Sequence, residues 1–314
     1  MGKEKRKMVK ENKILVTGGT GMVGRELQKI MPNAIYVGTK DCNLMNWSEV
    51  SALVKRHQPE LIIHLAAVVG GIMDNLSDPT KYIIANTLMN THILTAAHHY
   101  EVKKFIGMSS TCIYPDVMPI DSYPLKEECI HKGEPAKSNF GYAIAKRTMC
   151  ATIDSIRNQY KCQYCYLIPC NLYGEYDNYD TSRSHFVAAL IRKIYEAKKN
   201  NIDKIVLYGT GLPLRQFLFA ADLAKVIREM ILMNRYADLN VAPDETYSID
   251  EIARTALHAC DAEHLKIEYD TTKPDGQFRK DCSNKKLLNM MPDFNFTDLH
   301  TGLQETFIKY KPGF

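Results

Sequence analysis

A glycine-rich segment near the N-terminus constrains the fold of this chain more than any other feature. A short apolar run rich in β-branched residues occupies 13–17, glycines follow at positions 18, 21 and 24, and residues 25–30 are good helix formers. Glycine allows a sharp turn from strand to helix and lets a pyrophosphate approach the free N–H groups of the helix N-terminus. The order of strand, glycine turn and helix therefore predicts a nucleotide-binding βαβ unit rather than a merely structural turn.

Apolar, β-rich runs alternate with helical segments through the first half of the chain. Further strands are expected at 34–38, 60–67, 103–108 and 162–168, with helices at 47–57, 78–100 and 141–160. This alternation predicts an α/β fold built on a Rossmann-like, doubly wound parallel sheet. His64 is interpreted as a packed residue of the third strand. The later segments are shorter and mixed, which indicates a smaller α/β substrate domain.

The end of the second expected strand bears on the choice of nucleotide. An acidic residue at this place usually binds the ribose hydroxyls of NAD, whereas a basic residue accommodates the 2′-phosphate of NADP. Lys40 therefore favours NADP. Asp41 follows directly and either serves the ribose or only caps the turn, and the sequence leaves both alternatives open.

Two reactive side chains, Ser110 and Cys112, follow the fourth expected strand. Ligands of parallel sheets bind beyond the carboxyl ends of the strands, so this segment should border the site. If the backbone stays extended, residues two apart point the same way and both side chains share one wall of the pocket. The alternative for Cys112 is a small buried hydrophobe, which is what most free cysteines are.

Tyr142 and Lys146 lie four residues apart in a helical segment, so both project from one helix face. A lysine ammonium beside a phenol favours the phenolate and should lower the pKa of Tyr142 from its usual value of about 10. Tyr142 is thus a candidate proton donor. The spacing alone is common, because a Tyr and a Lys often merely share an exposed face.

Composition narrows the remaining possibilities. The formal net charge of +4 comes partly from residues 1–12, which we expect to form a flexible basic tail, so neither nucleic acid nor a membrane is an expected partner. Nine scattered cysteines fit a reducing, cytoplasmic compartment better than a disulfide framework, and no metal site is expected. The nucleotide-binding domain should comprise 13–173 and about 211–235, and the substrate domain about 174–210 and 236–314.

Together these residues resemble the extended short-chain dehydrogenase/reductase family, which combines the glycine pattern, a serine after the fourth strand and a Tyr-x-x-x-Lys pair. The chain is similar in particular to the GDP-L-fucose synthases of that family, and this similarity spans nearly the whole chain after the basic tail. It rests on the runs 109–115 (SSTCIYP), 139–146 (NFGYAIAK), 171–174 (NLYG), 184–185 (SH), 208–211 (YGTG), 215–217 (RQF) and 273–280 (KPDGQFRK).

The resemblance implies an NADPH-dependent enzyme that epimerises C3 and C5 of GDP-4-keto-6-deoxy-D-mannose and then reduces the C4 ketone to give GDP-L-fucose. It implies that Ser110 and Tyr142 act on the C4 oxygen, that Lys146 holds the ribose, and that Cys112 and His185 are the epimerisation pair. It also implies a homodimer formed through the helices at about 78–99 and 141–159.

The same resemblance implies two sets of binding residues. Thr20 and Tyr208 depart from an arginine of some relatives and a tryptophan common among them, which leaves Lys40 with more of the NADP discrimination. The implied cofactor contacts are Gly18, Thr20, Gly21, Met22, Val23, Gly24, Lys40, Asp41, Met108, Lys146, Pro169, Asn171, Leu172 and His185. The implied substrate contacts are Ser110, Lys193, Tyr208, Arg215, Asp275 and Lys280.

Two other functions remain open from the sequence. A nucleotide-sugar 4-epimerase or 4,6-dehydratase uses the same Ser, Tyr and Lys but gives no special role to Cys112 or His185. An NADP-sensing protein without catalysis needs the glycine loop but not the proton donor, so the intact Tyr142 and Lys146 pair argues against it.

Overall fold

The structure is a computed structural model, and it describes residues 9–180 and 184–310. A six-stranded parallel sheet forms its centre, in the order β10-β5-β4-β3-β1-β2. Strands β2 and β3 lie on opposite sides of β1, so the direction of winding reverses beside β1, where ligands of such sheets bind. The predicted doubly wound parallel sheet is confirmed. Its strands are β1 (Ile14–Thr17), β2 (Ile35–Val37), β3 (Leu61–His64), β4 (Lys104–Met108), β5 (Gln163–Pro169) and β10 (Leu239–Val241).

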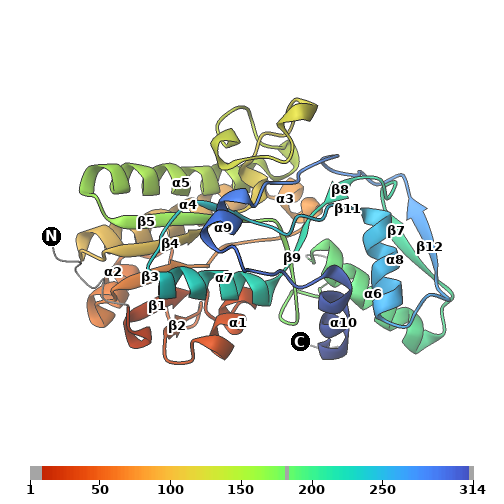
Figure 1. Ribbon diagram of the computed structural model, residues 1–314, viewed down its shortest axis with the longest axis horizontal. Coiled ribbons are helices and arrows are strands. Elements are labelled where there is room, and N and C mark those ends of the chain that lie inside the picture. Colours follow the sequence, from red (N-terminus) through yellow and green to blue (C-terminus); the bar gives the residue numbers. More distant parts are fainter. Residues whose placement is uncertain (1–8, 181–183, 311–314) are drawn as a thin grey trace.

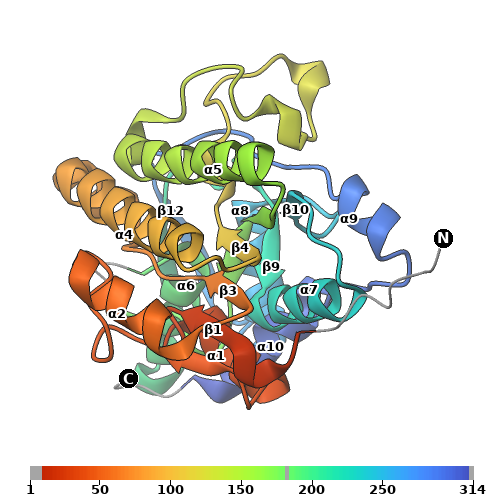
Figure 2. The ribbon, with the colours of Figure 1, turned by 90° about the vertical axis from the view of Figure 1, so that its left-hand side faces the viewer.

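Helices cover both faces of this sheet. Helices α2 (Trp47–His57), α4 (Pro79–His99) and α5 (Phe140–Tyr160) lie on one face, and α1 (Met22–Ile30) and α7 (Ala220–Met233) lie on the other (Figures 1 and 2). All residues of β1 and β3 are buried, as expected for strands covered on both faces. No helix in the described part of the chain is long and apolar enough to cross a membrane.

A smaller lobe stands beside the sheet and has a buried apolar cluster of its own (right in Figure 1). It contains the parallel pair β7 (Lys204–Tyr208) and β12 (Lys266–Asp270), with helices α6, α8 and α10. Short strand pairs β6–β9 and β8–β11 follow the carboxyl edge of the main sheet. The remaining bounds are α3 (Ile72–Ser77), β6 (Asn171–Tyr173), α6 (Phe186–Asn200), β8 (Leu214–Arg215), β9 (Phe217–Phe219), β11 (Tyr247–Ser248), α8 (Ile249–Ala259), α9 (Lys285–Met290) and α10 (Leu299–Lys309).

The start of the chain differs from the expected flexible tail over 1–12. Val9 is buried in the same apolar cluster as β1, and Glu11–Lys13 form a 3-10 turn that leads directly into that strand. The Glu11 carboxylate accepts a hydrogen bond from the Asn33 amide at 3.2 Å. Charge composition suggested the tail, but the burial of one apolar side chain orders residues 9–12. Residues 1–8 lie outside the described part of the chain.

The expected domain boundary after residue 235 also differs. Residues 239–241 form β10 at the edge of the main sheet, and Cys282, Leu287 and Met291 pack into the cluster of that sheet. The buried Asn240 joins these segments. Its carboxamide accepts from Tyr114 Oη at 2.6 Å and donates to the carbonyls of Leu125 and Ser283 at 3.0 and 3.1 Å. The three-residue strand is too short for sequence periodicity to reveal.

Candidate active site

The glycine turn between β1 and α1 has the geometry that a dinucleotide needs. Gly18 adopts φ +72°, and a Cβ there would stand 2.6 Å from the Ala66 amide nitrogen. A Cβ on Gly24 would stand 2.5 Å from the Gly19 carbonyl oxygen, so side chains are excluded at both positions. Helix α1 begins after Gly21 without a side-chain cap, which leaves N–H groups of its first turn open to a phosphate. The turn therefore fits the pyrophosphate of a dinucleotide.

The turn after β2 shows one contact of Asp41. Its carboxylate accepts a hydrogen bond from the Gly38 amide at 2.7 Å, so it caps the turn in this structure. Lys40 is exposed beside it. Thr20, in the glycine turn, lies close to Gly38, which brings the two turns together. Of the two residues at the end of β2, Lys40 is thus the one left free for an anionic group.

Ser110 and Cys112 border the carboxyl end of β4, as expected, but not on an extended backbone. Thr111–Ile113 form a 3-10 turn with Ser110 as its N-cap, and Ser110 Oγ accepts from the Cys112 amide at 3.3 Å. The premise of an extended chain was therefore wrong, because the serine hydroxyl competes for the backbone and favours a turn. Both side chains are partly accessible, so Cys112 is not the small buried hydrophobe of the alternative.

Two hydrogen bonds fix α5 against this segment. Lys146 Nζ donates to the Met108 carbonyl at 2.7 Å, and Arg147 Nε donates to the Ile113 carbonyl at 2.6 Å. They join the helix to the last residue of β4 and to the 3-10 turn respectively. Tyr142, one helical turn before Lys146, is thereby held beside the turn that carries Cys112, whose charge contributes to the electrostatics of the phenol.

The electrostatics of this helix differ from the expectation. Burial raises the pKa of the Tyr142 phenol, and the nearby Cys112 raises it further. Lys146 Nζ lies 5.8 Å from the centre of the Tyr142 ring and is only 1% exposed, and burial lowers the pKa of Lys146 to about 8. Desolvation therefore outweighs the predicted effect of the ammonium on the phenol. In this state Tyr142 is a protonated phenol, the form that a proton donor requires.

A cation approaches Cys112 from the C-terminal segment of the chain. Lys280 Nζ lies 3.8 Å from Cys112 Sγ, in hydrogen-bond contact with the thiol. The charges of Cys112 and Asp275 both act on the Arg215 guanidinium, whose pKa is lowered chiefly by burial. The structure thus brings two of the expected substrate residues, Arg215 and Lys280, to the reactive thiol.

His185 precedes the first residue of α6 and faces the same charge cluster. Its Nδ1 lies 3.5 Å from an oxygen of Asp177, and this hydrogen bond raises the pKa of His185 against the opposing effects of burial and of Lys280. Lys280 therefore acts on both Cys112 and His185. Sequence reasoning missed Asp177, and an acidic residue eight positions before a histidine in a polar loop gives no signal of their proximity.

The other expected substrate residues lie farther out in the smaller lobe. Lys193 Nζ donates to the Val206 carbonyl at 2.6 Å and stands 5.1 Å from the centre of the exposed Tyr208 ring. The Asp275 carboxylate is occupied by Thr210, accepting from its amide at 2.6 Å and from its hydroxyl. In this structure Asp275 therefore joins two loops at the edge of the site, while Lys193 and Tyr208 form a cationic, aromatic wall.

The remaining expected cofactor residues lie along the same edge. Pro169 ends β5, and Asn171 and Leu172 belong to β6, where Asn171 Nδ2 donates to the Gln216 carbonyl at 2.8 Å. Met22 and Val23 form the first turn of α1.

His64 is confirmed as a packed strand residue, because it is fully buried between Thr17 and Asn90 and burial lowers its pKa to about 3.

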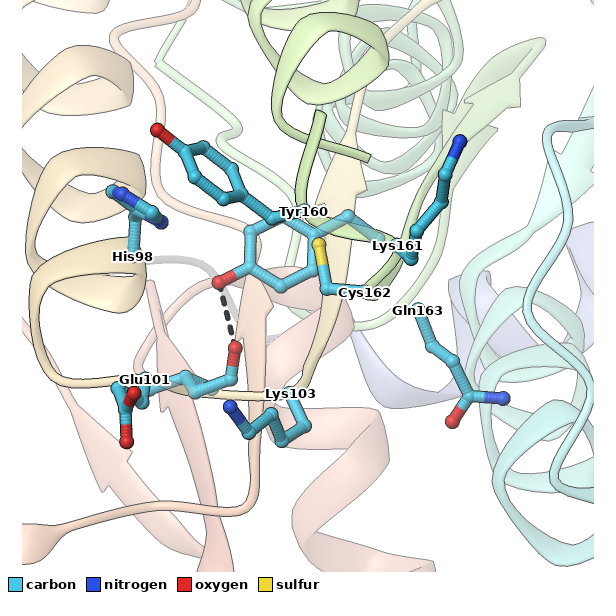
Figure 3. A pocket seen from close by; sticks show the side chains of 9 residues that line it. His98, Glu101, Lys103, Tyr160, Lys161, Cys162 and Gln163 are labelled. Atoms are coloured by element: carbon cyan, nitrogen blue, oxygen red, sulfur yellow. Dashed lines mark hydrogen bonds between the residues drawn. The ribbon is translucent and has the colours of Figure 1, made fainter. Parts of the chain in front are cut away.

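A separate pocket of about 550 Å³ lies at the opposite end of the sheet (Figure 3). It is bordered by the ends of α4 and α5, by residues 101–103 between α4 and β4, and by the first residues of β5. Within it, Tyr164 Oη donates to the Val102 carbonyl at 2.8 Å. Ligands of doubly wound sheets bind at the carboxyl ends of the strands, and this pocket adjoins their amino ends.

Among the residues that the structure describes, no three His, Cys, Asp or Glu side chains form a candidate metal centre.

The doubly wound sheet and its open glycine turn define a dinucleotide-binding protein, with serine, tyrosine and lysine side chains beside the end of β4. A model described as the NAD dependent epimerase/dehydratase family matches residues 14–242. Because this match covers more than half of the chain, the chain belongs to that family.

Individual relatives resemble it over nearly their full length. The chain is 35% identical over 305 residues to GDP-L-fucose synthase of Dictyostelium discoideum, which covers 93% of each. It is 34% identical over 303 residues to GDP-L-colitose synthase of Yersinia pseudotuberculosis, covering 94% of this chain and 96% of that protein. A crystal structure of a GDP-L-fucose synthetase from Naegleria fowleri bound to NADP is similar with a TM-score of 0.83 and 32% identity, covering 94% of this chain and 92% of the other.

Proposed function

We propose that this protein is an NADPH-dependent epimerase-reductase that converts GDP-4-keto-6-deoxy-D-mannose to GDP-L-fucose. The observation that carries the proposal is the position of Cys112, a partly accessible thiol in contact with Lys280 and close enough to Tyr142 to affect its pKa. A 4-epimerase or 4,6-dehydratase needs the tyrosine and the lysine, but its reaction does not require a thiol in contact with a lysine. The full-length similarity to enzymes named GDP-L-fucose synthase supports the same substrate.

The glycine turn and the end of β2 suit NADPH. The uncapped N-terminus of α1 receives the pyrophosphate, and the exposed Lys40 receives the 2′-phosphate, since Asp41 is engaged by the Gly38 amide. When bound, NADPH supplies the hydride that reduces C4. Lys146 contacts the nicotinamide ribose from its buried position at the end of β4. The remaining cofactor contacts come from the carboxyl edge formed by Met108, Pro169 and β6, and the NADP bound to the Naegleria relative supports this choice.

The reduction requires a proton for the C4 oxygen. The protonated phenol of Tyr142 donates it, and Ser110 Oγ donates a second hydrogen bond that polarises the ketone. The same polarisation acidifies the carbons on both sides of C4. One oxyanion site can therefore serve both epimerisations and the final reduction.

Epimerisation at C3 and C5 requires a base and an acid on opposite faces of the sugar. Cys112 stands on the turn after β4 and His185 at the start of α6, so the two come from different lobes of the molecule. We assign Arg215 and Lys193 to the diphosphate, Tyr208 to the nucleotide or sugar, and Asp275 to the edge of the substrate. We assign cofactor binding to the main sheet, which includes β10, and binding of the nucleotide sugar to the smaller lobe.

A second candidate product is GDP-L-colitose, favoured by the 34% identity to the Yersinia enzyme of that name. L-Fucose and L-colitose differ at C3. Product NMR therefore distinguishes the two activities when each 4-keto precursor is supplied with NADPH.

The experiment follows NADPH oxidation with GDP-4-keto-6-deoxy-D-mannose and identifies the product by NMR. Fucose supports the proposal, whereas a rhamnose product indicates a reductase without epimerisation. An unchanged ketone with folded protein refutes the proposal. Tyr142→Phe should lower kcat by about 10²–10⁴-fold, the usual contribution of a general acid. Cys112→Ser should block solvent-deuterium incorporation at C3 and C5 while leaving NADPH binding intact.

We further propose a homodimer that pairs α4 and α5 with their copies. These helices pack side by side on one face of the sheet (Figure 2). Apart from Lys81 in the first turn of α4, none of their exposed residues is Lys, Arg, Asp or Glu, in a chain that is 24% charged. Leu88→Lys should convert the dimer to a monomer in light scattering, and a wild-type monomer would contradict the pairing. The exposed or partly exposed residues along the middle of this face include Ile84, Leu88, Thr91 and Thr95 of α4 and Ile144, Thr148, Ala151 and Ser155 of α5. All nine cysteines are free thiols, which supports a cytoplasmic location.

A further inference from the structure

Asp177 is a buried carboxylate, and within the described part of the chain one of its two oxygens lacks a partner. Its side chain is only 5% exposed, and its backbone lies in the turn that begins at Gly174. Oδ1 accepts from the Asn178 amide at 2.7 Å and faces His185 Nδ1 at 3.5 Å. Among residues 9–180 and 184–310, Oδ2 has no hydrogen-bond partner.

A buried carboxylate without compensation is costly, and the adjacent imidazole can supply the compensation. Protonation of His185 places a positive charge beside Asp177, which is why this contact raises the pKa of His185. The hydrogen bond also fixes Nδ1 as a donor to Asp177. Nε2 is then the ring nitrogen that can deliver a proton to another molecule.

A cation, Lys280, also acts on His185. Lys280 Nζ contacts Cys112 Sγ at 3.8 Å, and its charge opposes protonation of His185. Asp177 and Lys280 are the charged groups that act on His185 in this structure. The carboxylate must therefore outweigh both the lysine and burial to keep the imidazole protonated.

We propose that Asp177 is a positioning residue that holds His185 as the protonated acid of the epimerisation. This inference rests on the proposed function. The Cys112 thiolate takes the proton from the carbon next to the ketone, and the electron pair of that bond passes to the C4 oxygen, where Ser110 and Tyr142 stabilise it. The enolate collapses as His185 Nε2 gives its proton to the opposite face of the same carbon. The thiol and neutral imidazole then regain their starting protonation through solvent.

The first test separates epimerisation from hydride transfer. Asp177→Asn should lower solvent-deuterium incorporation at C3 and C5 by about 10–100-fold, the range found when a partner that orients a histidine is lost. Oxidation of GDP-L-fucose by NADP+ measures hydride transfer without epimerisation, and its rate should stay within about twofold of wild type. The matched control is Glu263→Gln, which removes the carboxylate 2.6 Å from the exposed His258 and should change neither rate.

A second test does not depend on activity. NMR titration of His185, assigned with His185→Asn, should show a lower pKa in Asp177→Asn than in wild type. An unchanged titration overturns the inference, as does unchanged deuterium incorporation in an otherwise active enzyme. Equal losses of incorporation and of GDP-L-fucose oxidation indicate a structural role instead. A change confined to KM indicates direct contact with the sugar. If wild-type protein processes neither nucleotide sugar, the proposed function fails, and the titration still decides the pairing of Asp177 with His185.

Discussion

Lys146→Met tests whether the buried lysine of the site is held at the expense of stability. Lys146 is 1% exposed, and burial lowers its pKa from 10.5 to about 8. Each tenfold change in proton affinity corresponds to about 1.4 kcal/mol, so burying the ammonium costs about 3 kcal/mol at neutral pH. Above the folded-state pKa the native protein binds fewer protons than the unfolded chain. The free energy of unfolding therefore rises, through Lys146, as the pH increases from about 8 towards 10.5.

The assay is urea unfolding of wild type and Lys146→Met between about pH 7 and pH 10. Other groups titrate alike in both proteins, so the difference in their free energies of unfolding isolates Lys146. Wild type should gain about 2–3 kcal/mol relative to the variant over this interval. The variant also leaves the Met108 carbonyl without its donor, which costs about 1–3 kcal/mol at every pH. This loss changes the size of the difference in the free energy of unfolding but not its slope with pH.

The control for this experiment is Lys285→Met, which replaces an exposed lysine at the start of α9. Its difference from wild type should stay flat over the same interval. A Lys146→Met difference that is equally flat, within about 0.5 kcal/mol, would refute the desolvation of Lys146. A downward slope would show that an unseen acidic partner stabilises the ammonium.

Two further predictions concern the cofactor and the fold. Lys40→Ala should raise the Kd for NADPH more than the Kd for NADH, because only NADPH carries the 2′-phosphate that Lys40 is expected to bind. Calorimetric titration with both nucleotides measures the two Kd values, and equal effects contradict the prediction. Asn240→Ala should lower the free energy of unfolding in urea by about 2–4 kcal/mol, since it leaves Tyr114 and two carbonyls without partners. The exposed Asn295→Ala is its control, and an equal, small loss in both would contradict the role of the Asn240 network.

The glycine turn and the strand edge of the candidate site could be predicted closely because their signals are local. The turn at Gly18 and Gly24 requires residues without Cβ atoms, and the alternation of strands and helices fixes the edge at which β4 ends. Tyr142 and Lys146 share a helix turn, which spacing alone reveals. The prediction failed where local chemistry had competing solutions, as at Ser110, whose hydroxyl caps a 3-10 turn instead of leaving the chain extended.

By itself, the sequence determined the doubly wound sheet, the glycine turn and the reactive residue types, since these follow from backbone preferences and from apolar spacing along the chain. Only the tertiary structure decided the charge states. The contacts of Asp177 with His185 and of Lys280 with Cys112 join separate elements, and the burial that raises the pKa of Tyr142 is set by the packing around it. Desolvation and Coulomb energy depend on distances through space, which spacing along the chain does not encode.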